Sequence, residues 1–222
     1  MPDIAELVEA RIQRPHAIAE AAAARRRPAS LFGAHGRMMI IAADHPARGA
    51  LRAGADPLAM ANRADLLDRI CTALARPGVN GVLGTPDILE DLLLLGALDD
   101  KVVIGSMNRG GLAGTSFEMD DRFTAYDPGS LAAAGFSGGK MLLRIDPDDA
   151  GTVATLEACG RAVGELAGHR LMAMVEPFIS HRVDGLVRND LSAEAMIRAM
   201  TVAAGLGTTS AYTWLKVPVV AD

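Results

Sequence analysis

Cysteines and long apolar segments are scarce in this sequence. Cys71 and Cys159 are the only cysteines and neither belongs to a CxxC pair, which disfavours a disulfide framework and a thiolate zinc site. No apolar run approaches about 18 residues, the length that crosses a membrane. The N-terminus carries Asp3, Glu6 and Glu9 where a signal peptide would be basic and then apolar. We therefore expect a soluble cytoplasmic protein without a membrane partner.

An excess of basic charge is also missing. The 22 lysines and arginines are outnumbered by 27 acidic residues, which gives a net charge of −5. No basic stripe with interleaved aromatic residues occurs, and this argues against a nucleic-acid partner. Half of the residues are hydrophobic, so 222 residues can bury a substantial core in one domain.

The order of the predicted elements indicates the fold class. Residues 4–26 read as helical with a break at Pro15, which predicts an N-terminal helical extension over 1–35. Strands and helices then alternate. The predicted strands are 37–44, 81–85, 101–106, 138–145, 169–177 and a sixth strand around Lys216, and the predicted helices run from Asp56-Pro57 to about 76, over 86–95, from 146–150 to about 168, and onward from Ser192.

Alternating strands and helices predict an α/β fold with a parallel sheet and helical crossovers. Polar residues at successive strand ends favour a TIM (β/α)8 barrel over an open sheet, with the barrel domain spanning 36–222. Such a barrel takes about 250 residues. Because the sequence stops directly after the sixth strand, we expect the barrel to be truncated there.

The sixth strand contains a lysine in an apolar, β-prone run. Trp214, Leu215, Val217 and Val219 surround Lys216 and predict a strand buried on both faces. Burial disfavours the ammonium form of a lysine and favours the neutral amine that a Schiff-base nucleophile requires. A snorkelling or ion-paired lysine is the structural alternative.

Four polar residues lie at the ends or in the interiors of four predicted strands: Asp44, Lys140, Glu176 and Lys216. Functional residues of barrels gather at the carboxyl ends of the strands. Lys140 and Glu176 alone could form a structural ion pair. Two lysines and two carboxylates from four strands indicate catalysis, in which a carboxylate moves the protons of carbinolamine formation and retro-aldol cleavage.

The segments around these residues resemble a known family. Asp44 after the first strand, together with 139–146, 175–177 and 215–218, is similar to class I (Schiff-base) aldolases of the DhnA, tagatose-bisphosphate aldolase and deoxyribose-phosphate aldolase-like type. The resemblance implies that Lys216 is the Schiff-base lysine, with Lys140, Glu176 and Asp44 as further catalytic residues.

The same resemblance implies a sugar or sugar-phosphate substrate, no metal and no cofactor, and we expect a homo-oligomer. The family's phosphate site lies largely in loops after strands seven and eight, which this sequence does not contain. The candidate substrate-binding residues are Asn108 and Arg109 in a long glycine-rich loop over 107–127, Arg144 on the fourth strand, and His45.

Two other functions stay open. Asp44, His45, Glu176 and His181 could hold a metal for metal-dependent aldol chemistry, although no HxH or HExxH spacing marks them. Alternatively, a truncated barrel could be catalytically impaired and act only as a structural or oligomerising protein, because its open sheet edges would tend to associate.

Overall fold

The computed structural model describes residues 3–33, 35–108 and 111–220. These residues fall into two compact units. The first comprises the chain up to Gly105 together with Ala133–Ser137, and the second comprises Ser106–Ala132 and the chain from Gly138 onward. None of the described helices combines the length and the apolarity needed to cross a membrane.

The first unit begins with two short helices, α1 (Ile4–Gln13) and α2 (Ala17–Ala24). The side chain of Asp3 caps α1 by accepting the backbone N–H of Ala5 at 2.8 Å. Pro15 lies between the two helices, which confirms the predicted break. Because proline has no N–H and clashes with the preceding turn, one continuous helix cannot form here.

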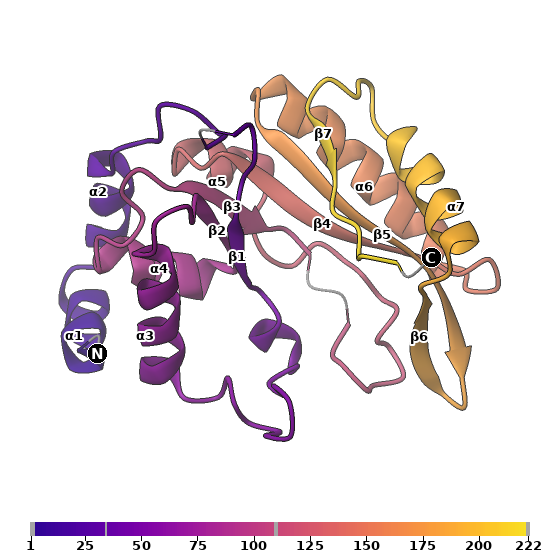
Figure 1. Cartoon of the computed structure of the whole chain (residues 1–222), viewed down its shortest axis with the longest axis horizontal. Coiled ribbons are helices and arrows are strands. Elements are labelled where there is room, and N and C mark those ends of the chain that lie inside the picture. The colour runs from indigo at the N-terminus through magenta and orange to yellow at the C-terminus, as the bar shows by residue number, and fades with distance from the viewer. Residues whose placement is uncertain (1–2, 34, 109–110, 221–222) are drawn as a thin grey trace. The chain divides into compact units, whose positions relative to one another are not determined.

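A three-stranded parallel sheet forms the centre of the first unit (Figure 1). The strand order is β1-β2-β3. Apolar runs without alternation are typical of such strands because both of their faces are covered. The elements of this sheet and its connections are β1 (Ile40–Ala43), the 3-10 helix η1 (Pro46–Arg48), α3 (Arg63–Leu74), β2 (Gly81–Gly84), α4 (Pro86–Leu94) and β3 (Val102–Ser106).

The prediction that a helix starts at Asp56-Pro57 is wrong. Asp56 instead forms a local turn, in which its carboxylate accepts the N–H of Leu58 at 2.8 Å. The helix α3 starts after Asn62, whose side chain accepts the N–H of Asp65 at 3.1 Å. Aspartate followed by proline favours turns as well as helix starts, and the better-placed asparagine provides the cap.

The second unit contains three parallel strands and one antiparallel strand. Strand β5 pairs in parallel with β4 and with β7, and its second half pairs antiparallel with β6 (Figure 1). Strand β4 has the predicted bounds. The elements are α5 (Pro128–Ala133), β4 (Gly138–Ile145), α6 (Gly151–Gly168), β5 (Met172–Val183), β6 (Leu186–Asp190), α7 (Ala193–Ala204) and β7 (Thr213–Leu215).

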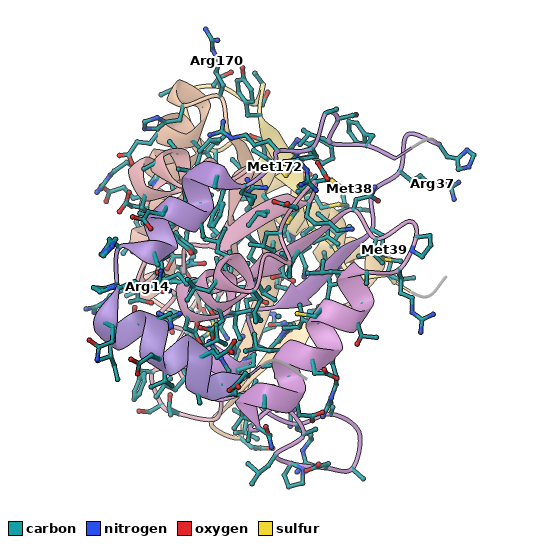
Figure 2. All side chains as sticks on the ribbon, turned by 90° about the vertical axis from the view of Figure 1, so that its left-hand side faces the viewer. Arg14, Arg37, Met38, Met39, Arg170 and Met172 are labelled. Atoms are coloured by element: carbon teal, nitrogen blue, oxygen red, sulfur yellow. The ribbon has the colours of Figure 1, made fainter. Side chains whose placement is uncertain are left out.

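The turn from α6 into β5 separates a solvated residue from a core residue. Figure 2 shows Arg170 projecting from the fold, and its φ of 57° reverses the chain direction after the helix. Met172, the first residue of β5, is only 3% exposed. The backbone N–H of Leu171 between them donates to the carbonyl of Leu166 at 2.9 Å, which closes the helix end.

Strand β5 is longer than predicted. The sequence places its end at Glu176-Pro177, whereas the strand continues to Val183 and turns back as β6. Asp184 and Gly185 form the turn of this hairpin with φ values of 51° and 77°. Left-handed φ values at both central residues are the pattern of a two-residue hairpin turn, and Asp-Gly is a preferred pair for it.

The predicted burial of the sixth strand on both faces is wrong for several residues. Leu215 is 37% exposed, Val217 is 44% exposed and Val219 is 99% exposed. Strand β7 is three residues long and pairs with β5 along one edge. Over the described residues no strand pairs with its other edge, so the apolar side chains of this segment stay partly in solvent.

Candidate active site

Two neighbouring strands bring Lys140 and Glu176 together. In the β4–β5 register Lys140 lies opposite Met174, and Leu142 lies opposite Glu176. Because side chains alternate along a strand, Lys140, Leu142 and Glu176 share one face of the sheet. The distance between Lys140 Nζ and Glu176 Oε2 is 2.5 Å. Lys140 is only 5% exposed, so this ion pair is largely shielded from water.

Strand β7 adds Lys216 to the same face. Leu215 pairs with Val175, and the backbone N–H of Lys216 donates to the carbonyl of Val175 at 2.9 Å. Lys216 is therefore the residue next to Glu176 across the two strands. Its Nζ donates a hydrogen bond to Glu176 Oε1. The side chain of Lys216 is 37% exposed, so a molecule from solvent can reach it.

Proline at position 177 ends the ladder between β5 and β7 at Lys216. Ala173 donates its N–H to the carbonyl of Tyr212 at 2.9 Å, and Lys216 donates to Val175 two residues further along β5. The next rung would require an N–H from residue 177, which proline does not have. The backbone is thus hydrogen-bonded to β5 up to Lys216 and leaves the sheet directly after this residue.

The carboxylate of Glu176 is held in its charged form. Burial by itself would raise the pKa of Glu176, but the attraction of Lys140 and Lys216 and their hydrogen bonds outweigh burial and lower this pKa. A carboxylate in hydrogen-bond contact with two lysine amines can accept a proton from either of them. The arrangement of Lys140, Glu176 and Lys216, called the triad below, is thus the ion-paired arrangement that the sequence left open as the structural alternative for Lys216, and it places one carboxylate where a proton can pass between two amines.

Asp44 and His45 belong to the first unit, whereas the triad belongs to the second. Asp44 directly follows β1 and is only 8% exposed. His45 starts the 3-10 helix η1, and its Nδ1 lies 3.5 Å from Asp44 Oδ1. The strand-end position of Asp44 confirms where the sequence places it. A catalytic role for Asp44 and a substrate-binding role for His45 stay predictions.

Asn108 is fully buried in the second unit and bonds to the backbone. Its Nδ2 donates to the carbonyls of Asp121 and Leu142, both at 2.8 Å. Its Oδ1 accepts the N–H of Leu142 at 2.6 Å. The amide thus joins the loop after β3 to β4. The structure gives Asn108 a scaffold role, and its contact with substrate stays a prediction. Arg109 lies outside the described residues.

Arg144 is likewise held within the protein. Its guanidinium forms a buried ion pair with Asp121, in which Nη2 lies 2.5 Å from Oδ1 and Nε lies 3.0 Å from Oδ2. It also donates to the backbone carbonyl of Glu118, and Nη1 lies 3.5 Å from the Glu118 carboxylate. These contacts anchor the loop on β4. Binding of substrate by Arg144 stays a prediction.

Sequence reasoning missed Asp121 and Glu118, the partners of Arg144. Asp121 is 1% exposed and connects Arg144 with the amide of Asn108. One signal was available, because a buried arginine on an apolar strand requires a carboxylate partner and the polar loop supplies several. Spacing alone does not show which loop carboxylate it is.

The metal alternative has no preformed cluster. Within the described part of the chain, no three histidine, cysteine, aspartate or glutamate side chains gather as candidate metal ligands. The oxygens of Glu176 contact amines, and His181 Nδ1 lies 3.8 Å from Asp146. Because Asp44 and His45 belong to the other unit, the four-residue metal site predicted from the sequence stays a prediction.

A cavity of about 720 Å³ lies in the second unit between the loop over 117–128 and α6. Phe117, Phe123, Tyr126 and Arg161 are among its lining residues, and none of the triad residues is. The cavity and the triad are therefore different places in this unit, and the chemistry of the lysines points to the triad as the candidate active site.

Comparison with known proteins decides the family. A family model described as Cgl0159-like matches residues 36–222, which is most of the chain. The chain belongs to the Cgl0159-like family. The crystal structure of Cgl0159 from Corynebacterium glutamicum (Brevibacterium flavum) is 53% identical, with a TM-score of 0.95. The alignment covers 99% of this chain and 74% of Cgl0159. Among the curated proteins none matches.

More distant solved structures show the fold of this Cgl0159-like chain. An archaeal fructose 1,6-bisphosphate aldolase is 20% identical with a TM-score of 0.53. A Schiff-base-forming fructose-1,6-bisphosphate aldolase is 21% identical with the same TM-score. Each alignment covers 84% of this chain and 66% of the aldolase. The prediction of an aldolase-like α/β fold is therefore confirmed, whereas the specific aldolase types named from the sequence are not shown.

Proposed function

We propose that this protein is a class I aldolase, a lyase that cleaves or forms a C–C bond in a sugar or sugar-phosphate through an imine on Lys216. The observation that carries the proposal is the triad, in which Lys216 and Lys140 share the carboxylate of Glu176. Only Lys216 of the two lysines is accessible enough to meet a substrate carbonyl. The aldolase fold and the Schiff-base chemistry of one structural neighbour support this reaction class.

The proposed reaction starts with attack of the neutral Lys216 amine on the substrate carbonyl, which forms a carbinolamine. Loss of water then leaves an iminium ion on Nζ. When the C–C bond breaks, its electron pair moves to the iminium nitrogen and forms an enamine, while the leaving hydroxyl gives its proton to a base. Protonation of the enamine carbon and hydrolysis release the second product and restore the amine.

Glu176 and Lys140 have defined roles in this scheme. The carboxylate of Glu176 accepts the proton that Lys216 must lose before it attacks. Lys140, in contact with the other oxygen of Glu176, donates a proton when water leaves the carbinolamine. We assign a further proton-transfer role to Asp44, and substrate contacts to Arg109, Arg144 and His45. The substrate contact predicted for Asn108 is not carried over, because its amide is fully buried and bonds to protein backbone groups. The imine replaces a Lewis-acid metal, so the proposed reaction uses no metal and no cofactor.

We further infer that residues 36–222 form a (β/α) barrel domain of the TIM type with fewer than eight strands, preceded by the helical extension, and that the protein is a cytoplasmic homo-oligomer. Parallel strands with polar carboxyl ends support the barrel. The partly exposed apolar run over 215–219 also supports the second candidate function, a non-catalytic oligomerising protein.

A cleavage assay separates these functions. Fructose 1,6-bisphosphate and a panel of unphosphorylated ketoses and their phosphates are incubated with the protein and with Lys216→Ala, and aldehyde release is measured. The aldolase proposal predicts release by the wild-type protein and none by the variant. Equal release by both proteins would reject Lys216, and no release with any substrate together with a stable oligomer would favour the non-catalytic function.

A further inference from the structure

The loop after β3 completes one edge of β4 with hydrogen bonds that a neighbouring strand would otherwise supply. Residues 140, 142 and 144 direct their backbone polar groups to this edge, because successive residues of a strand alternate between its two edges. Met107 donates its N–H to the carbonyl of Lys140 at 2.9 Å. The amide of Asn108 binds both polar groups of Leu142, and the carboxylate of Asp121 accepts the N–H of Arg144 at 3.3 Å.

These hydrogen bonds to the edge of β4, called the loop ladder below, lie beside the triad. The carbonyl held by Met107 belongs to Lys140 itself. The residue clamped by Asn108, Leu142, is the register partner of Glu176 on β5. The edge of β4 is thus fixed at the two positions that set the distance between the Lys140 and Glu176 side chains. Asn108 occupies the middle of the loop ladder and is fully buried, so its amide is shielded from solvent.

We propose that Asn108 is a positioning residue of the triad. Its hydrogen bonds to Leu142 fix the position of β4 beside β5, and this position keeps the Lys140 side chain in contact with Glu176. The effect of Asn108 on catalysis rests on the proposed function, whereas its effect on the contact between Lys140 and Glu176 does not. It replaces the substrate contact that the sequence predicts for Asn108. A merely structural asparagine would add stability without affecting the charge state of Glu176 or the reactivity of Lys216.

The test uses Asn108→Asp as its main variant. Aspartate has the same shape and keeps an acceptor for the N–H of Leu142, but it loses the donor to the carbonyls of Leu142 and Asp121 and places negative charge beside them. Asn108→Ser is a second variant, which removes the amide without placing a negative charge beside the two carbonyls. The matched control is Asn80→Asp, because the Asn80 side chain also accepts a backbone N–H, that of Met39 directly before β1 in the other unit, at 2.9 Å.

Two readouts are measured on the folded 222-residue protein. The first is the pH titration of the Glu176 carboxyl carbon by 13C NMR, with the signal assigned by its loss in Glu176→Gln. The second is the rate of borohydride-trapped imine formation at Lys216 with glyceraldehyde as the probe. The proposal predicts that Asn108→Asp moves the Glu176 midpoint upward, because Lys140 moves away, and slows trapping by about tenfold or more. Asn108→Ser acts in the same direction, and Asn80→Asp changes neither readout.

The outcomes separate this proposal from the proposed function. Variants that are less stable but keep the wild-type Glu176 midpoint and trapping rate would overturn the positioning role. Loss of folding in both Asn108 variants would also overturn it, since Asn108 would then be a general scaffold residue. If wild-type protein forms no imine while the Glu176 midpoint still moves in the Asn108 variants, the proposed function fails and the positioning role stands.

Discussion

Lys140 and Lys216 lie on either side of a single carboxylate, that of Glu176, and come from strands that are not adjacent in the sheet. Strand β5 lies between β4 and β7 and carries the glutamate. Lys140 is almost fully buried and Lys216 is more than one-third exposed. In the proposed reaction this difference makes Lys216 the amine that bonds to the substrate carbon, because a substrate can reach only the accessible amine.

Replacement of Lys140 by methionine is expected to lower turnover by about 100-fold or more, because it removes the proton donor on the far side of Glu176. The loss of unfolding free energy should stay below about 2 kcal/mol, since Lys216 still pairs with Glu176. Turnover and urea unfolding measure the two effects. Lys101→Met is the matched control, because Lys101 in the other unit bonds the carbonyl of Val79 and no carboxylate of the triad. Full turnover in Lys140→Met would make Lys140 structural.

Stability should fall with acid through Glu176. The pKa of this carboxyl is lower in the folded protein than its ordinary value of 4.5, so the unfolded chain binds more protons. The stabilisation is present above pH 4.5 and is lost as the pH falls through the folded pKa. Urea unfolding between pH 3 and pH 6 should therefore show a smaller pH slope in Glu176→Gln than in the wild type. Equal slopes would show that other carboxyls account for the acid sensitivity.

Asp91 is expected to stabilise the first unit. Its carboxylate is 7% exposed and binds the guanidinium groups of Arg11 at 2.8 Å and Arg63 at 2.6 Å, which joins α1, α3 and α4. Both arginines are one-third exposed, so we expect Asp91→Ala to cost about 2 kcal/mol, less than a fully buried pair. Glu157→Ala, which breaks an exposed pair with Arg161 on α6, should change little. An unchanged urea midpoint in Asp91→Ala would contradict the network.

Turnover is expected to survive removal of divalent metals. In the proposed reaction the iminium on Lys216 draws electrons from the breaking bond, which is the task of a metal in the alternative chemistry. Activity is measured before and after dialysis against EDTA, and again after zinc or manganese is added back. Loss on dialysis with recovery on adding metal would move the assignment to a metal-dependent aldolase.

The triad was predictable because three strong sequence signals agree. Lys140 and Glu176 lie in apolar strands and Lys216 directly follows one, and parallel strands in register bring residues of the same face together. The hairpin after Glu176 was also present in the sequence as the pair Asp184-Gly185 between apolar residues, but Pro177 suggested an earlier end of the strand. Proline in fact ends only the pairing with β7, while β5 continues along its other partners.

The roles of Asn108 and Arg144 could not be predicted in the same way. Both residues follow or lie on strands, as substrate-binding residues often do, yet their partners are the backbone of β4 and Asp121 in a long loop. The docking of an irregular loop leaves no periodicity in the sequence. Likewise, the helix start at Asn62 and the turn at Asp56 use the same residue chemistry, and only packing distinguishes them.

Borohydride trapping at Lys216 tests the central claim most directly. The chain has three lysines, Lys101, Lys140 and Lys216, so a reduced adduct with glyceraldehyde or dihydroxyacetone can be assigned by peptide mass. We predict one adduct, on the peptide of residues 199–222 that results because trypsin no longer cleaves after Lys216. Lys216→Ala and Lys216→Arg should both abolish it, since guanidinium stays protonated in proteins. An adduct on Lys140 instead, or none in a preparation that cleaves substrate, would contradict the Schiff-base assignment.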